Sequence, residues 1–151
     1  MRLFLAAITP NRSRPKSDPA AALADDYLAR ASRYVLSEAQ TYPSESAFLY
    51  WFDRQAARTA PVLILLDSRG QQLTSEAFAA QLGHFRDADT QSLVFAIGPA
   101  DGWSAVVRAR ATLTISFGPI TLPHELARAV LAEQIYRGFT ILSNHPYHTG
   151  H

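Results

Sequence analysis

Cysteine is absent from the 151 residues, which excludes disulfides, thiolate metal ligands and a cysteine nucleophile. Charged residues are few, at 18%, and the net charge of +1 gives no overall field that would attract nucleic acid. Long apolar runs are missing as well, because stretches such as residues 62–66 are far too short to cross a bilayer. We therefore expect a cytoplasmic protein with no membrane segment.

The apolar share of 48% is typical of a globular protein, and no linker or repeat divides the chain, so residues 1–151 are expected to form one domain. The apolar stretch at residues 3–8 lacks a small-residue cleavage site and is interpreted as a buried strand. Any RNA would have to be held by a local patch, for which Arg12, Arg14 and Lys16 are candidates. A merely solvated loop explains these three residues about equally well.

Short apolar runs alternate with longer amphipathic stretches, a pattern typical of an α/β fold with helices on the faces of a sheet. Residues 62–66 and 93–97 are apolar without interruption, which predicts strands buried on both faces of a parallel sheet. Strands are predicted at residues 2–8, 61–67, 92–98 and 112–116, with a weaker edge strand at 38–42.

Helices are predicted between the strands, each beginning at a side chain that can cap the first turn. Asp18 precedes a proline at the first helical position, Ser44 can cap a second helix, and Thr74 or Ser75 a third. The predicted helices extend from Asp18 to about residue 37, from 44 to 58, from 74 or 75 to 83, briefly after 102, and from 123 to 138.

Two loops follow strands at positions where open α/β sheets bind ligands. Residues 97–102 contain glycines but match neither the dinucleotide fingerprint nor the P-loop, so an ordinary turn remains an alternative. Residues 116–123 are stiffened by two prolines and could line an apolar pocket or serve only as a connector.

The last predicted helix pairs Glu133 with Arg137 at the favourable i, i+4 spacing. Its apolar residues lie on more than one side, so the helix must bury more than one face. We favour burial against a second subunit over a central position in a monomer. The residues concerned are Leu126, Val130, Leu131, Ile135 and Phe139.

The tail holds His145, His148 and His151. Pro146 interrupts any helix there and the tail has no carboxylate side chain, so a metal site is not expected. A histidine near neutrality can accept or relay a proton, although idle histidines at a frayed end are an alternative.

Three segments carry a family resemblance: residues 122–128 (Leu-Pro-His-Glu-Leu-Ala-Arg), 131–137 (Leu-Ala-Glu-Gln-Ile-Tyr-Arg) and 143–148 (Ser-Asn-His-Pro-Tyr-His). With them the chain resembles the RlmH-type 23S rRNA pseudouridine N3-methyltransferases of the SPOUT superfamily, most strongly over residues 93–148. The resemblance implies a SPOUT-like parallel sheet flanked by helices, a C-terminal trefoil knot and a homodimer.

The resemblance also implies that S-adenosylmethionine is held largely through backbone groups. The implied residues are Leu66, Gly98, Phe117, Gly118, Pro119, Ile120, Thr121 and Leu122. Arg137, Tyr147 and His148 would face the RNA, and His148 or Arg137 would help the imide nitrogen of a pseudouridine in large-subunit rRNA to lose its proton. A diverged relative that binds RNA or ribosomes without catalysis is the alternative.

The chain departs from the family pattern at three places. Pro99 replaces the second glycine of the first loop, which removes an N–H near the expected cofactor. Thr149 replaces a basic residue after the tail motif, and residues 46–52 are unusually aromatic. Each departure predicts a weaker hold on cofactor or RNA.

Overall fold

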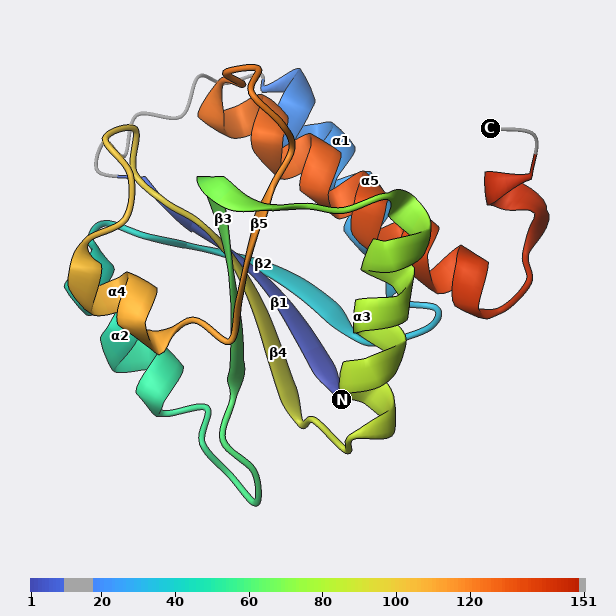
Figure 1. Ribbon diagram of the computed structural model, residues 1–151, viewed down its shortest axis with the longest axis horizontal. Coiled ribbons are helices and arrows are strands. Elements are labelled where there is room, and N and C mark those ends of the chain that lie inside the picture. Colours follow the sequence, from blue (N-terminus) through green and yellow to red (C-terminus); the bar gives the residue numbers. More distant parts are fainter. Residues whose placement is uncertain (10–17, 150–151) are drawn as a thin grey trace.

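Five parallel strands form one sheet at the centre of the protein (Figure 1). The computed structural model describes residues 1–9 and 18–149. The strand order is β2-β1-β4-β3-β5. The strands are β1 (Arg2–Ile8), β2 (Ser37–Tyr42), β3 (Val62–Gln72), β4 (Ser92–Ile97) and β5 (Leu113–Ser116). The predicted parallel sheet is confirmed, including the weak edge strand, which is β2.

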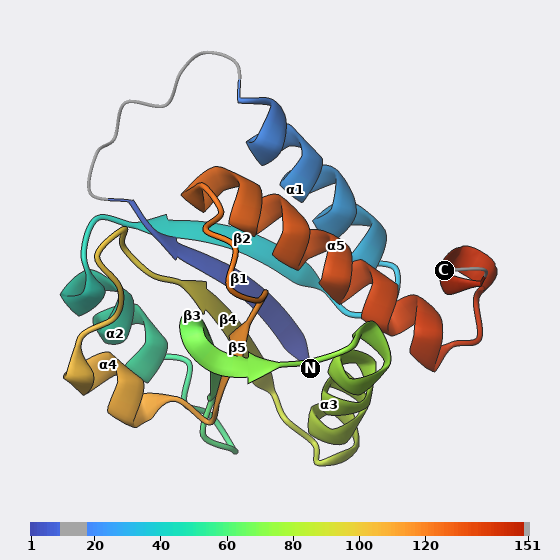
Figure 2. The ribbon, with the colours of Figure 1, turned by 45° about the horizontal axis from the view of Figure 1, so that its top comes forward.

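Helices cover both faces of the sheet (Figures 1 and 2). The elements are α1 (Pro19–Ala31), α2 (Glu45–Asp53), α3 (Ser75–Asp87), α4 (Ala105–Arg110), α5 (His124–Leu142) and the short 3₁₀ helix η1 (Pro146–His148). Helices α1, α3 and α5 lie on one face, and α2 and α4 lie on the other. Asp18, Ser44 and Thr74 accept the predicted capping hydrogen bonds.

Side chains alternate strictly along β1, an inner strand of the sheet, and the alternation gives the protein two cores. Leu3 and Leu5 join the core beneath α1, α3 and α5, whereas Phe4 and Ala6 join the core beneath α2 and α4. The second core holds most of the aromatic stretch at residues 46–52, because α2 turns its phenylalanines inward. Those aromatic residues therefore build the fold.

The predicted helix ends were wrong in two opposite ways. α1 ends at Ala31, because the Ser32 hydroxyl donates to the Leu28 carbonyl and accepts from the Ser37 N–H. α2 stops at Asp53, five residues before the predicted end. α3 and α5 instead continue four residues past Gly83 and Gly138, the residues at which we expected them to end.

Strand β3 is longer than predicted because its register with β5 shifts between Leu66 and Gln71. Both of these residues face Ile115, so residues 67–70 bulge out at the end of the sheet. No helix among residues 1–9 and 18–149 is long and apolar enough to cross a membrane. The basic residues Arg12, Arg14 and Lys16 lie outside the described residues.

Candidate cofactor and substrate site

A large cavity of about 720 Å³ opens where β3, β4 and β5 end. Its walls come from the β3 bulge, the loop after β4 and the loop between β5 and α5. This is the edge at which open parallel sheets bind ligands. All eight residues that the family resemblance implied for the cofactor line this cavity, although they come from three separate segments.

The β5–α5 loop is a rigid wall of the large cavity. Gly118 has φ +102°, a conformation that side chains disfavour. The Ser116 hydroxyl holds the turn by accepting from the Gly118 N–H and donating to the Gly118 carbonyl, at 3.1 and 3.3 Å. Among the described residues no side chain caps α5, so N–H groups of its first turn are available beside the cavity.

Trp103 forms part of the cavity wall, and sequence reasoning missed it. Its ring is buried, and its indole N–H donates to the Leu66 carbonyl at 3.1 Å. A Cβ on Gly98 would lie 2.8 Å from the Trp103 ring, so only glycine fits there. The residue after Gly98 is Pro99, which lines the cavity, and its carbonyl accepts from the Gly102 N–H.

Polar groups at opposite sides of the large cavity were also missed. Asp67, whose side chain is only 5% exposed, accepts three hydrogen bonds from Arg69, which lower the pKa of its carboxyl. His124 lies at the start of α5, and its buried Nε2 has no hydrogen-bond partner among the described residues. A ligand with polar groups would satisfy that nitrogen.

The tail folds back onto α3 and α5. His148 contacts Arg137 through Nδ1 at 3.0 Å and Glu76 through Nε2 at 2.8 Å. A guanidinium only donates, so Nδ1 must accept and Nε2 must carry the proton that goes to Glu76. In this arrangement Arg137 occupies the Nδ1 nitrogen of the imidazole.

Arg137 and Tyr147 meet on the same carboxylate. Glu133 accepts from the Arg137 guanidinium at 2.7 Å and from the Tyr147 hydroxyl at 2.9 Å. This contact raises the pKa of Arg137, and burial raises the pKa of Tyr147. The guanidinium carbon also lies 4.8 Å from the centre of the Tyr147 ring. The structure therefore brings together the three residues predicted to face the RNA.

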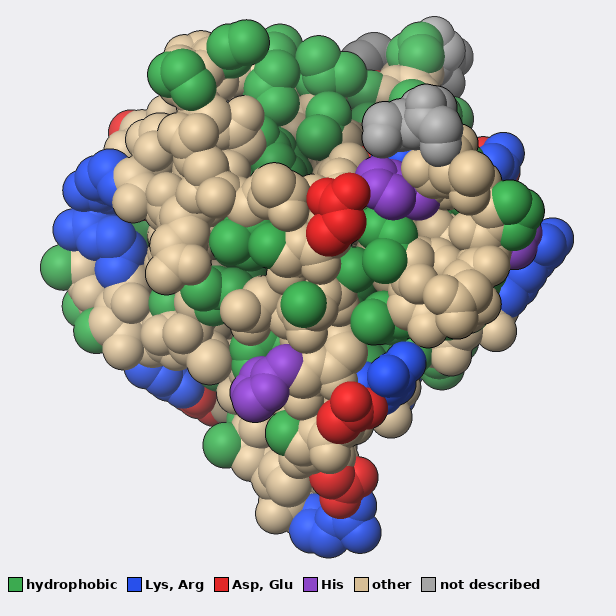
Figure 3. All heavy atoms as spheres, turned by 45° about the vertical axis from the view of Figure 1, so that its right-hand side comes forward, with side chains coloured by type: hydrophobic (Ala, Val, Ile, Leu, Met, Phe, Trp, Pro, Cys, Tyr) green, Lys and Arg blue, Asp and Glu red, His purple; other side chains and the backbone are tan. Residues whose placement is uncertain are grey.

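The face drawn in Figure 3 has no continuous basic surface, and the described residues contain no group of metal ligands. On the face drawn in Figure 3, lysine and arginine side chains lie in small separate groups and form no continuous basic surface. Within residues 1–9 and 18–149, no group of three or more His, Cys, Asp or Glu residues could hold a metal. His145 accepts from the Tyr147 backbone N–H, and His151 lies outside the described residues.

Fold and site together define a class of protein: a parallel α/β domain with a ligand cavity closed by the loop before its last helix. A family model described as "Predicted SPOUT methyltransferase" matches residues 1–148. The chain therefore belongs to the SPOUT methyltransferase family, as its last third indicated.

Individual relatives narrow this assignment to the RlmH type. The chain is 55% identical over 129 residues to the ribosomal RNA large subunit methyltransferase H of Koribacter versatilis, covering 85% of this chain and 88% of that protein. It is 45% identical over 154 residues to the protein of the same name from Rhodospirillum centenum, covering 98% and 99%.

Solved structures agree on the fold. A probable methylase family protein from Haemophilus influenzae matches with a TM-score of 0.59 at 9% identity, covering 98% of this chain and 70% of that one. The SpoU methyltransferase AviRb from Streptomyces viridochromogenes, solved with AdoMet, matches with a TM-score of 0.50 at 15% identity, covering 92% and 60%. At such low identities the likeness concerns the fold alone.

Proposed function

We propose that the protein transfers a methyl group from S-adenosylmethionine to N3 of a pseudouridine in 23S rRNA. The observation that carries the proposal is the large cavity, which collects all eight residues implied for the cofactor from three distant segments. The relatives that cover nearly the whole chain carry the name of a large-subunit rRNA methyltransferase. Large-subunit rRNA or the ribosome, in the cytoplasm, is accordingly the proposed partner.

The large cavity suits S-adenosylmethionine in size and chemistry. Its volume of about 720 Å³ falls among cavities that bury small ligands. Backbone groups of Leu66, Gly98 and the 117–122 loop would hold the cofactor, and the orphaned His124 nitrogen offers it a further polar contact. The Asp67 carboxylate would favour the cationic end. Pro99 removes one N–H from this wall without blocking the cavity.

Bound S-adenosylmethionine supplies a methyl group already activated by the positive sulfonium. The protein must therefore align that methyl group with a nitrogen and help the nitrogen to lose its proton. His148 is the proposed base. Its Nδ1 becomes able to accept a proton when Arg137 turns from the imidazole toward the target base.

Arg137 would also stabilise the reacting base. Its guanidinium would lie next to the negative charge that develops on the imide when the proton leaves. Glu133 holds the guanidinium beside Tyr147, whose ring packs edge-on against Tyr136 with the ring centres 4.8 Å apart. Tyr147 would help to hold the base or its neighbour in the RNA.

The trefoil knot and the homodimer belong to this proposal as well. Most apolar residues of α5 are buried against α1, α3 and the sheet of the same chain, so its several apolar faces do not by themselves require a partner. Two exposed apolar residues support the dimer: Ile120, which lines the large cavity and is 75% exposed, and Leu126 in the first turn of α5, which is 43% exposed. A second copy covering them would complete the site near the interface.

The substitution His148→Ala tests the proposed chemistry. We expect the rate of methyl transfer to ribosomes to fall by about 10²–10⁴-fold, the usual contribution of a general base. The dissociation constant of S-adenosylmethionine, measured by calorimetry, should stay nearly unchanged. Lost cofactor binding in the variant would refute the assigned role of His148. Absence of cofactor binding by the unaltered protein at millimolar concentration would refute the enzyme itself.

A further inference from the structure

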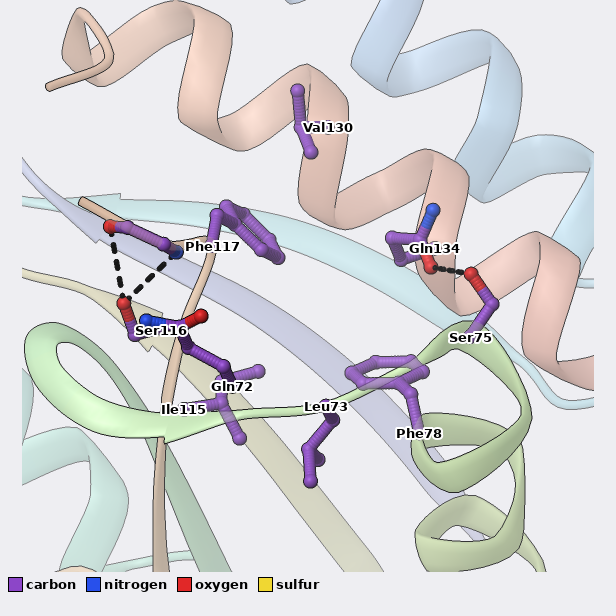
Figure 4. Close-up of a pocket in the computed structure, with 10 residues that line it drawn as sticks. Gln72, Leu73, Ser75, Phe78, Ile115, Ser116, Phe117, Val130 and Gln134 are labelled. Carbon is purple, nitrogen blue, oxygen red and sulfur yellow. Dashed lines mark hydrogen bonds between the residues drawn. The ribbon is translucent and has the colours of Figure 1, made fainter. Parts of the chain in front are cut away.

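A small hollow of about 330 Å³ lies next to the large cavity, and neither the cofactor nor the tail accounts for it (Figure 4). Its walls come from the end of β3, the start of α3, the β5–α5 loop and the middle of α5. Phe78, Phe117 and Val130 supply apolar surface. Ser75, Gln72 and Gln134 supply hydroxyl and amide groups.

The small hollow lies between the large cavity and the tail. It shares the wall at residues 116–118 with the large cavity. Along α5, Ala127 borders the large cavity, Gln134 borders the small hollow, and Arg137 holds the tail. Ten residues separate Ala127 from Arg137, a distance of about 15 Å along a helix. A base that receives a methyl group from the large cavity and also contacts the tail would occupy this interval.

Two hydrogen bonds connect the small hollow to the tail and fix its polar side. The Ser75 hydroxyl donates to the Gln134 amide oxygen at 2.8 Å, which joins α3 to α5. The Gln134 amide nitrogen donates to Glu133 at 2.8 Å, and Glu133 in turn holds Arg137 and Tyr147. Half of the hydrogen-bonding capacity of the Gln134 amide remains for a ligand, because an amide can form four bonds.

The chemistry of the walls selects a class of ligand. Among the described residues, none that lines the small hollow is charged, so it suits a neutral group better than a phosphate. Amide and hydroxyl groups can match a ring edge that carries both N–H donors and carbonyl acceptors. Aromatic and branched side chains provide surfaces against which a flat ring can stack.

We propose that the small hollow receives the uracil-type ring of the target pseudouridine, turned out of the RNA, with its edge on Ser75 and Gln134. This proposal rests on the proposed function and adds where the target base binds. The two sites meet at residues 116–118, so the N3 edge of the ring would face the methyl group of the cofactor beside Phe117. Extrusion of the base is the usual solution for enzymes that modify it.

The substitutions Val130→Phe and Gln134→Leu test the site. The first fills the small hollow, and the second removes its polar edge at similar volume. We expect each to lower kcat/KM for ribosomes that lack the modification by about tenfold or more. The cofactor dissociation constant should stay close to that of the unaltered protein in both variants. The melting temperature should fall only for Gln134→Leu, which loses the hydrogen bond to Ser75. Val106→Phe, on the exposed side of α4, is the control. It should change neither kcat/KM nor the cofactor dissociation constant.

A second measurement uses the unaltered protein and does not depend on turnover. Pseudouridine 5′-monophosphate, added at millimolar concentration with S-adenosylhomocysteine, should shift the methyl NMR signals of Val130 and Ile115 but not of Val106. Adenosine 5′-monophosphate, which carries the same phosphate on a larger ring, should leave all three unchanged.

The outcomes that would overturn the base site differ from those that would overturn the methyltransferase reaction. Normal methyl transfer by both Val130→Phe and Gln134→Leu, or nucleotide-induced shifts that spare Val130 and Ile115, would overturn the base site and leave the methyltransferase intact. Shifts at Val130 and Ile115 in a protein that transfers no methyl group to rRNA would instead overturn the proposed reaction.

Discussion

Asp67 keeps its charge at a nearly buried position because Arg69, two residues further on, folds back over it. Three hydrogen bonds from Arg69, one of them from the backbone, lower the pKa of the Asp67 carboxyl. The pair therefore shapes the β3 bulge, which forms one wall of the large cavity. Its contribution to stability depends on pH.

Asp67→Asn should lower the free energy of unfolding by about 1–2 kcal/mol near pH 7, since Arg69 is largely exposed and the pair is partly screened. A lowered pKa stabilises the fold above the ordinary aspartate value of about 3.9, and this stabilisation is lost as pH falls through the folded pKa. Urea titrations from about pH 7 down to about pH 2 should show the two proteins converging at the acid end, below the ordinary aspartate pKa. A difference that stays constant over this range would mean that the charge of Asp67 does not matter.

The sequence predicted individual residues of the site unevenly. The cofactor loop and the tail residues were predicted because they form long ordered motifs, and their roles stay predictions. Trp103 and His124 were missed because their roles depend on contacts with Leu66 and the large cavity, which no spacing in the sequence indicates. Residues that act through a distant neighbour become visible only in the fold.

At the scale of helices and strands, two glycines explain why the predicted ends of α3 and α5 were wrong. Gly83 and Gly138 look like helix ends in the sequence. In the structure they lie where the two helices touch: a Cβ on Gly138 would lie 2.6 Å from the Leu82 side chain, and one on Gly83 3.1 Å from Leu142. Glycine is favoured both at helix ends and where two helices pack closely, so the sequence alone does not distinguish the two roles.

Gly138→Val should therefore separate α3 from α5 and lower the free energy of unfolding by about 1–3 kcal/mol. The cost arises from the contact with Leu82, since valine itself fits a helix better than glycine does. Ala80→Val adds a similar side chain on the exposed side of α3 and should change stability by about 0.5 kcal/mol or less. Equal melting temperatures for Gly138→Val and Ala80→Val would contradict the packing role.

At the scale of the whole molecule, the α/β class and the parallel sheet followed from continuous apolar strands alternating with amphipathic helices. The knot did not follow from any such pattern, because threading leaves no periodicity in a sequence. The homodimer was favoured from the apolar residues on several sides of α5, but most of these residues are buried within the same chain. Both the knot and the homodimer stay predictions.

The dimer can be tested at Leu126, which is exposed on the first turn of α5. Leu126→Glu should convert a dimer into a monomer in sedimentation velocity at micromolar concentration, because it buries a charge in an apolar contact. Val106→Glu, on the opposite side of the sheet, should leave the dimer intact. An unaltered protein that sediments as a monomer at every concentration would contradict the proposed assembly.

Mass spectrometry of the modified rRNA identifies the product of the proposed reaction. Ribosomes that lack the modification are incubated with the protein and isotope-labelled S-adenosylmethionine, and the nucleosides of the 23S rRNA are analysed. We expect one labelled methyl group per ribosome, found on N3 of a pseudouridine. Label on another base, or bound cofactor with no label in the RNA, would contradict the proposed reaction.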